Sequence, residues 1–157
     1  FIEAKKLKDI VGETLRQFIK ANQKLLEALS RKLKENLILL NPREFEKFIA
    51  YLFNKIGFRT EITPYVSDYG ADIVAERGEN RIVVQVKKYI GQNVGAQEVQ
   101  QSLGSMWRYK ANKAILVTTT DFTAQALEQA KGAPIELWNQ KTLHQIIETT
   151  FFKRYSI

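Results

Sequence analysis

The chain has 157 residues, of which 45% are hydrophobic, enough for one domain with a hydrophobic core plus an appendage. It contains no cysteine, which excludes disulfides, zinc–thiolate sites and thiol catalysis, so we expect a reducing, cytoplasmic setting. Lysine and arginine number 24 against 17 acidic residues, and this net charge of +7 favours polyanionic partners such as nucleic acid or an anionic membrane surface. No apolar run approaches the roughly 18 to 20 residues that span a bilayer.

Residues 1–40 predict a long, basic, amphipathic helix ahead of the main domain. Apolar residues recur there in steps of mostly four, four and three, without a proline before residue 36. The positions are Leu7, Val11, Leu15, Phe18, Leu26, Leu29, Leu33 and Leu37, with Asn22 in the one missing place. This spacing is typical of a straight or slightly right-handed helix. Such a helix can pack along its own domain, pair with a second copy, or lie on DNA or a membrane surface.

Residues 41–157 predict an α/β domain. Its first helix begins at Asn41, with Pro42 first and Glu44 third, as a capping box prefers. The predicted elements that follow are a strand over 59–66, a hairpin of strands 71–76 and 81–87, a helix over 96–109, a strand over 113–119, a helix from 123, a strand over 134–138 and a helix over 140–150. This order predicts three layers, with helices flanking a mixed sheet that is antiparallel at its start and joined by crossovers later.

The hairpin brings three polar side chains toward one another. Its predicted turn covers residues 78–80, a glycine and an asparagine between two apolar runs. Because side chains alternate along a strand, Gln85 and Lys87 project to one side, and Asp72 lies near the same open end. A carboxylate, an amide oxygen and an ammonium group therefore converge.

These groups suit metal-dependent phosphodiester hydrolysis, which needs a divalent ion and a cation that positions the nucleophile. Mg²⁺ prefers oxygen ligands and keeps several waters. Asp72 supplies a charged ligand, the Gln85 side-chain carbonyl a neutral one, and Lys87 the cation. The main-chain carbonyl of Val86 is a further candidate ligand. Glu46 on the first body helix is a candidate to contribute directly or through water.

A series of short motifs runs in order between residues 41 and about 147. They are Phe45-Glu46, Asp68-x-Gly70-x-Asp72, Gln85-x-Lys87, Leu103-Gly104, Val117-Thr118-Thr119 and Phe122-Thr123. In this order they resemble the Mrr-type restriction endonuclease domain of the PD-(D/E)xK nuclease superfamily. The resemblance implies a restriction-endonuclease-like fold that cleaves double-stranded DNA with Mg²⁺, for which Mn²⁺ substitutes. It also implies an active site of Asp72, Gln85 and Lys87, assisted by Glu46.

One position departs from the wider superfamily, which usually carries an acid where this chain has Gln85. The neutral amide removes a negative charge and weakens metal binding unless Glu46 or the substrate phosphate compensates. Asp68 fits a turn-capping residue better than a ligand. The competing interpretation is therefore a DNA-binding or structure-sensing module of the same fold that does not cleave.

Four residues are candidates for contact with DNA. Lys88 follows the strand end, and Gln101 lies on the next helix, where a solvated helix face explains it equally well. Arg108 and Lys110 belong to a basic and aromatic patch over residues 107–110 that suits contact with a phosphate backbone.

Overall fold

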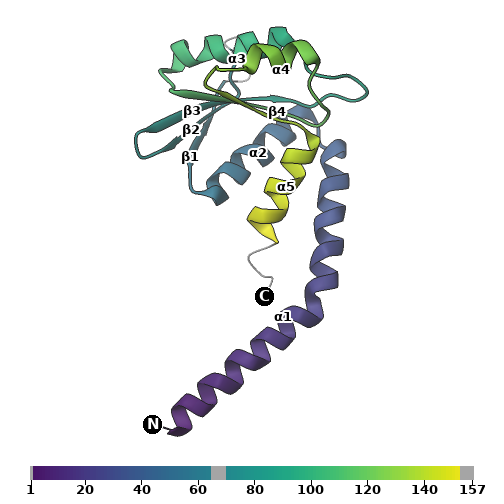
Figure 1. Cartoon of the computed structure of the whole chain (residues 1–157), viewed down its shortest axis with the longest axis vertical. Helices are drawn as coiled ribbons and strands as arrows, with labels where there is room; N and C mark the ends of the chain where they lie inside the picture. The colour runs from purple at the N-terminus through teal and green to yellow at the C-terminus, as the bar shows by residue number, and fades with distance from the viewer. Residues whose placement is uncertain (1, 65–69, 153–157) are drawn as a thin grey trace.

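A central sheet separates two layers of helices in the computed structural model of the chain, which describes residues 2–64 and 70–152. The strands are β1 (Arg59–Ile62), β2 (Ile73–Arg77), β3 (Asn80–Lys87), β4 (Lys113–Thr118) and β5 (Ile135–Trp138). The helices are α1 (Ile2–Asn36), the short 3-10 helix η1 (Leu37–Leu39), α2 (Pro42–Ile56), α3 (Ala96–Tyr109), α4 (Ala124–Ala130) and α5 (Gln140–Phe151). Figure 1 shows α3 and α4 on one face of the sheet and α2 and α5 on the other. The predicted three-layer fold is confirmed.

The sheet is mixed, as predicted. Its strands lie in chain order, with β1, β2 and β3 antiparallel and β3, β4 and β5 parallel. The crossovers between the parallel strands carry α3 and α4, which cover one face. The carboxyl ends of β3, β4 and β5 therefore meet at one edge of the sheet, which we call the carboxyl edge.

The regular pairing of the hairpin ends next to the two predicted metal ligands. Ile73 on β2 pairs with Val84 on β3. Asp72 comes just before this pair and Gln85 just after it, and the Asp72 N–H donates to the carbonyl of Val84 at 2.8 Å. The turn contains residues 78–79 only, one residue fewer than predicted, and Gly78 takes the positive φ of 61° that this tight connection needs.

Two strand boundaries differ from the prediction. β1 ends at Ile62 rather than at residue 66, because Pro64 has no N–H for the ladder. β2 begins at residue 73 rather than 71, since the last regular pair of the hairpin is Ile73 with Val84. Residues 65–69, and with them the predicted turn residue Asp68, lie outside the described residues.

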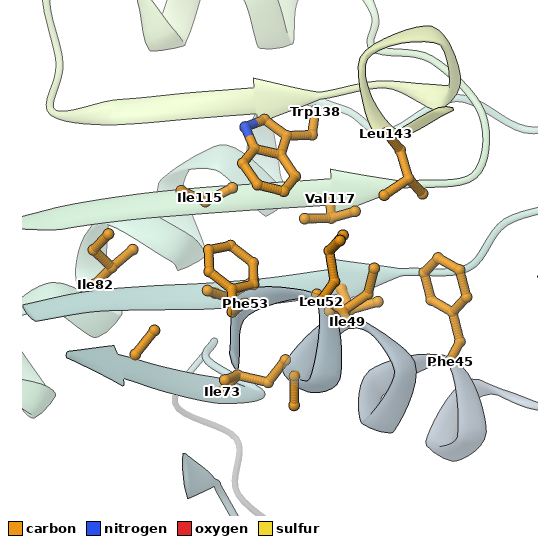
Figure 2. Close-up of a cluster of buried hydrophobic side chains, with 14 of the residues drawn as sticks. Phe45, Ile49, Leu52, Phe53, Ile73, Ile82, Ile115, Val117, Trp138 and Leu143 are labelled. Atoms are coloured by element: carbon orange, nitrogen blue, oxygen red, sulfur yellow. The ribbon is translucent and has the colours of Figure 1, made fainter. Parts of the chain in front are cut away.

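The main core lies between the sheet and the layer of α2 and α5 (Figure 2). Its α2 members include Phe45, Ile49, Leu52 and Phe53. The ring of Phe53 stacks on Trp138 of β5 with 5.2 Å between centroids. Leu37 of η1 is buried in the same cluster, so the segment before α2 is part of the core. This packing fixes α2 against the sheet and, with it, the side chains that α2 directs toward the hairpin.

Among the α1 side chains that the structure describes, those at the end of the helix contact the rest of the domain. Leu33 packs on the core, and the Lys34 ammonium pairs with the Glu148 carboxylate at 3.0 Å. The remainder extends away (Figure 1). Five of its apolar residues are 54–65% exposed: Leu7, Ile10, Val11, Leu15 and Phe18. Packing along its own domain is therefore limited to the last turns. Among the described residues, no helix combines the length and apolarity that crossing a membrane requires.

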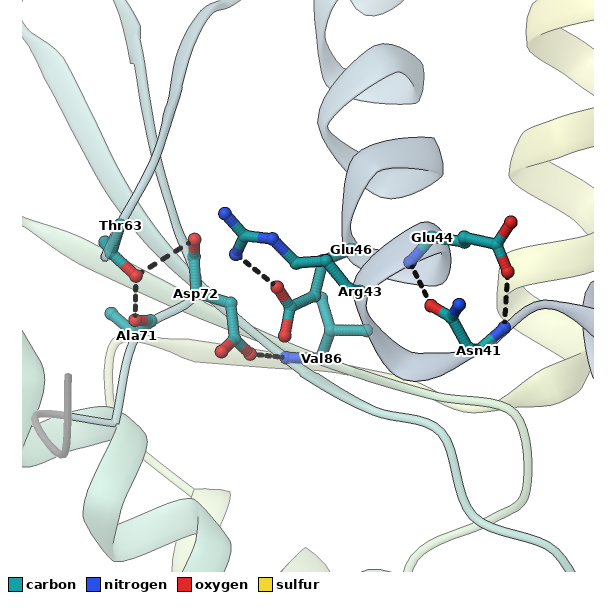
Figure 3. A network of polar contacts seen from close by, with 8 residues as sticks. All are labelled: Asn41, Arg43, Glu44, Glu46, Thr63, Ala71, Asp72 and Val86. Carbon is teal, nitrogen blue, oxygen red and sulfur yellow. Dashed lines mark hydrogen bonds and ion pairs between the residues drawn. The ribbon is translucent and has the colours of Figure 1, made fainter. Parts of the chain in front are cut away.

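The predicted capping box at the start of α2 is present. Asn41 Oδ1 accepts from the Glu44 N–H at 2.8 Å, and Glu44 Oε1 accepts from the Asn41 N–H at 2.9 Å (Figure 3). Gly57 ends the helix with a φ of 116°. These contacts set the first turn of α2, from which Arg43 and Glu46 project.

Replacing the cap tests this interpretation. We expect Asn41→Ala to lower the free energy of unfolding by about 1 kcal/mol, because the first turn loses an acceptor for its N–H groups. Asn41→Ser is the matched control, since its hydroxyl can accept the same bond. Urea denaturation measures both. Equal stability of the alanine and serine variants would contradict the role of the cap.

Candidate active site

The regular pairing of β2 with β3 ends at Asp72. There the Asp72 side chain, in place of a main-chain carbonyl, accepts the next hydrogen bond from β3. Its Oδ2 accepts from the main-chain N–H of Val86 at 2.7 Å (Figure 3). The N–H and C=O of one strand residue point to the same side of the strand. The Val86 carbonyl is therefore directed toward the space beside Asp72. A carboxylate and a main-chain carbonyl thus meet at the carboxyl edge.

Thr63, which follows β1, holds the residues that lead into β2. The Asp72 carbonyl accepts from the Thr63 N–H at 2.9 Å, and the buried Thr63 hydroxyl lies 2.8 Å from the carbonyl oxygen of Ala71. Gly70 has a φ of 73°, and a Cβ at this position would lie 2.6 Å from the main-chain oxygen of Gln101 on α3. A side chain at position 70 would therefore displace the turn or the helix, and with it Asp72.

A second carboxylate, Glu46, comes from α2 and points toward Asp72 (Figure 3). Glu46 is only 9% exposed, so it lies on the buried side of α2 and is not a surface acid. Its carboxylate pairs with the guanidinium of Arg43 at 2.9 Å. The sequence analysis missed Arg43, although its i, i+3 spacing from Glu46 on the helix is a signal for such a pair.

Burial raises the pKa of Asp72 from 3.8 to about 6. The hydrogen bond from Val86 lowers the pKa, the negative charge of Glu46 raises it, and the positive charges of Lys87 and Arg43 lower it. Exclusion of water outweighs the stabilising contacts. At neutral pH, Asp72 therefore carries its charge at a free-energy cost that a bound cation would offset.

Gln85 is also buried, at 5% exposure, and it faces α3. Its Oε1 accepts from the hydroxyl of Ser102 at 2.5 Å, and Ser102 is buried as well. A carbonyl oxygen has two lone pairs, so the Ser102 bond leaves one for a cation. Ser102 was not predicted. Its signal is the step of three from the buried Val99, which puts it on the side of α3 that faces the sheet.

Lys87 is the last residue of β3 and is half-buried. Strand alternation places it on the same side as Gln85. Its charge lowers the pKa of Asp72, so the two groups interact electrostatically. No hydrogen bond or ion pair joins its ammonium group to another residue in the part of the chain that the structure describes.

The four predicted DNA-contact residues fall into two pairs. Lys88 follows β3 at the carboxyl edge, and Gln101 lies against the turn at Gly70, so both are near the site. Arg108 and Lys110 lie at the other end of α3, next to the start of β3. A strand of this length separates the two ends by roughly 25 Å. The structure therefore does not bring the second pair to the site.

The donor atoms at the site are oxygens. Within residues 2–64 and 70–152, no three His, Cys, Asp or Glu side chains gather into a metal-binding group. The candidate ligand atoms are the carboxylate oxygens of Asp72 and Glu46, the amide oxygen of Gln85 and the carbonyl oxygen of Val86. Such a set suits a hard cation that keeps several waters, such as Mg²⁺, better than it suits Zn²⁺.

The mixed five-stranded sheet with helices on both faces is a restriction-endonuclease-like fold. The family model Mrr_cat, described as restriction endonuclease, matches residues 38–147. The chain belongs to this family, and the predicted resemblance over residues 41 to about 147 is confirmed.

Known proteins agree with this assignment. The chain is 27% identical over 139 residues to the type IV methyl-directed restriction enzyme EcoKMrr of Escherichia coli (strain K12), covering 82% of this chain and 45% of that enzyme. It thus spans less than half of that relative. The fold is similar to that of the DNA modification-dependent restriction endonuclease AspBHI, with a TM-score of 0.58, 21% identity and coverage of 82% of this chain and 35% of that one. A protein of unknown function, AF1548, gives a TM-score of 0.53 at 22% identity, covering 60% and 55%.

The raised pKa of Asp72 predicts a pH-dependent stability. The folded protein binds a proton at Asp72 more tightly than the unfolded chain does, so stability falls as the pH rises from about 4 to about 6. Asp72→Asn removes this effect. At 1.36 kcal/mol per pKa unit, we expect its stability relative to the wild type to be about 2 kcal/mol greater at pH 8 than at pH 4.

Urea denaturation at both pH values measures this difference. The control variant is Asp9→Asn, which removes an exposed carboxylate of α1 instead. A stability difference between Asp72→Asn and the wild type that stays constant with pH would show that burial does not perturb Asp72.

Proposed function

We propose that this domain hydrolyses phosphodiester bonds of double-stranded DNA, with Mg²⁺ as its cofactor and Mn²⁺ as a substitute, in a cytoplasmic setting. The observation that carries the proposal is the half-buried Asp72 carboxylate beside the Val86 carbonyl, where β2 and β3 separate. Membership of a restriction endonuclease family and the resemblance to EcoKMrr support it.

The residues present fit a magnesium ion. Asp72, the side-chain oxygen of Gln85 and the carbonyl of Val86 would hold it, with Glu46 contributing directly or through water. When bound, the ion supplies charge neutralisation at the phosphate and lowers the pKa of a coordinated water. The raised pKa of Asp72 supports this role, because a cation next to the carboxylate favours its charged form.

The other residues position the reacting groups. Lys87 orients the attacking water and stabilises the negative charge that develops on the phosphate. Glu46 restores the negative charge that Gln85 lacks. Arg43 holds Glu46 in place through its ion pair, and Ser102 orients the Gln85 amide through its hydroxyl.

The basic surface would bind the phosphate backbone. Lys88 and Gln101 are placed to contact DNA near the cleaved bond. Arg108 and Lys110 would meet the duplex farther along α3. These contacts would carry little sequence information, because backbone contacts position DNA without reading its bases.

Cleavage of supercoiled plasmid DNA tests the site. With Mg²⁺ or Mn²⁺ present, we expect Lys87→Ala and Asp72→Ala each to lower the cleavage rate by about 100-fold or more. The first removes the cation that stabilises the phosphate charge, and the second removes the charged ligand of the metal. Lys131→Ala is the matched control, because the Lys131 side chain is 78% exposed and follows the end of α4, away from the site. Equal activity of the site variants and the control would refute the assignment of the site. Cleavage that persists in excess chelator would refute the metal.

A second function is a DNA-binding module that does not cleave. The observation that favours it is the neutral Gln85, whose oxygen already accepts a hydrogen bond. Filter binding in chelator, followed by addition of Mg²⁺, separates the two functions. Tight binding without turnover after the metal is added would support the module.

The exposed part of α1 is proposed to pair with a second copy of the chain. Its contiguous apolar side chains are typical of an interaction surface. We expect a concentration-dependent dimer in sedimentation velocity, and a monomer for the triple variant Leu7→Ser, Val11→Ser, Leu15→Ser. Gln17→Ser, on the polar side, is the control. A wild-type monomer at every concentration would contradict the pairing.

A further inference from the structure

An open groove of about 500 Å³ lies along the carboxyl edge, beside the candidate active site. It is bounded by the loop after β3 (residues 88–95), the loop after β4 (residues 119–123), the start of α5 and η1. None of the residues proposed for catalysis lines it. Its volume is typical of a pocket for a small ligand.

Two isoleucines line this groove from different elements. Ile38 comes from η1, and Ile90 comes from the loop after β3, three residues beyond Lys87. Ile90 is 73% exposed and Ile38 is 45% exposed. The groove therefore offers apolar contact surface close to the proposed point of cleavage.

The loop that carries Ile90 is held firmly. The Tyr89 N–H donates to the Thr119 hydroxyl oxygen at 3.0 Å, and the Thr119 hydroxyl donates to the Tyr89 carbonyl at 2.7 Å. The Thr120 hydroxyl donates to the Gln92 carbonyl at 2.7 Å. These bonds flank Ile90 on both sides, so its exposed position is built into the loop.

The groove also contains polar groups with capacity to bind. The side-chain amides of Asn93 and Gln140 make no hydrogen bond with any residue that the structure describes. Asp121 Oδ1 accepts from Asn139 Nδ2 at 3.2 Å, which leaves Oδ2 available. Apolar surface together with amides and a carboxylate matches a nucleobase, which has flat apolar faces and an edge of donors and acceptors.

The same groove is poorly suited to a phosphate. At the start of α5, the Thr142 N–H already donates to Asn139 Oδ1 at 2.9 Å, and the Gln140 N–H donates to the Thr120 carbonyl at 2.9 Å. The Asp121 carboxylate adds a negative charge beside these groups, and Lys141, which also lines the groove, carries the opposite charge. A phosphate would therefore meet two occupied main-chain donors and charges of both signs.

We propose that the groove receives a nucleobase with an exocyclic amino group, turned out of the DNA stack beside the cleaved phosphate. Ile90 enters the stack as an apolar wedge, as apolar side chains do in proteins that kink DNA. The Asp121 carboxylate accepts from the amino group, as acidic side chains accept from cytosine. The DNA substrate rests on the proposed function, whereas the choice of base follows from the groove itself.

Free nucleosides test the chemistry of the groove without cleavage. In ¹⁵N–¹H spectra of the full chain, we expect deoxycytidine to shift the amides of Ile90, Asn93 and Gln140. We expect thymidine, which lacks the amino group, to bind about tenfold more weakly. Deoxyribose 5-phosphate, which lacks a base, should leave these amides unchanged. Shifts with the sugar phosphate alone, or none with any compound, would overturn the proposal.

A duplex that contains 2-aminopurine at several positions tests the DNA. This fluorescent purine brightens when it leaves the stack. In chelator, we expect wild-type protein to raise its fluorescence. Ile90→Ser should bind the duplex within about twofold by anisotropy, because phosphate contacts supply most of the affinity, but it should lose most of the rise. Leu127→Ser, exposed on α4, is the matched control and should behave as wild type.

The two proposals fail in different ways. Plasmid cleavage without a fluorescence rise would overturn the groove and leave the nuclease standing. A fluorescence rise that depends on Ile90, without plasmid cleavage in metal, would overturn the nuclease and leave the groove standing. If the Ile90→Ser variant gave the full fluorescence rise, Ile90 would not act as the wedge.

Discussion

The hydrogen bond from the Val86 N–H to the Asp72 carboxylate is the contact on which the candidate site depends. Because of this bond, the pairing of β2 with β3 can end while the buried N–H of Val86 still has an acceptor. An opening therefore forms beside β3, which is otherwise buried. The same contact directs the Val86 carbonyl into that opening. The cost is that the Asp72 carboxylate is partly shielded from water, which raises its pKa to about 6. A site that is unfavourable for the protein alone is one that a cation stabilises.

The remaining charges follow from the neutral Gln85. A second acid next to Asp72 on β3 would have raised the cost of burial further, whereas Glu46 brings its charge from α2 together with the guanidinium of Arg43. The charge of Glu46 is therefore partly balanced before any metal binds. The packing of α2 matters for the same reason, because the stack of Phe53 on Trp138 and the cap at Asn41 hold the helix that carries both residues.

Local rules account for what could be predicted from the sequence. Three predictions follow from neighbouring residues: the cap at Asn41, the strand alternation at Gln85 and Lys87, and the order of the crossovers. The structure agrees with these predictions. The missed features depend on contacts between distant segments. Ser102 meets Gln85 only after α3 packs on the sheet, and the distance of Arg108 from the site follows from the direction of α3. Asp72, Gln85, Lys87 and Glu46 remain predictions as catalytic residues, although the charges of Glu46 and Lys87 do act on Asp72.

The most direct test of the central claim is anomalous scattering from crystals of the protein soaked in Mn²⁺. The proposed site predicts a peak roughly 2.1 to 2.3 Å from an Asp72 carboxylate oxygen and the Val86 carbonyl oxygen, absent from crystals of Asp72→Asn. A peak elsewhere that leaves these oxygens without a metal, or a peak unchanged in Asp72→Asn, would contradict it.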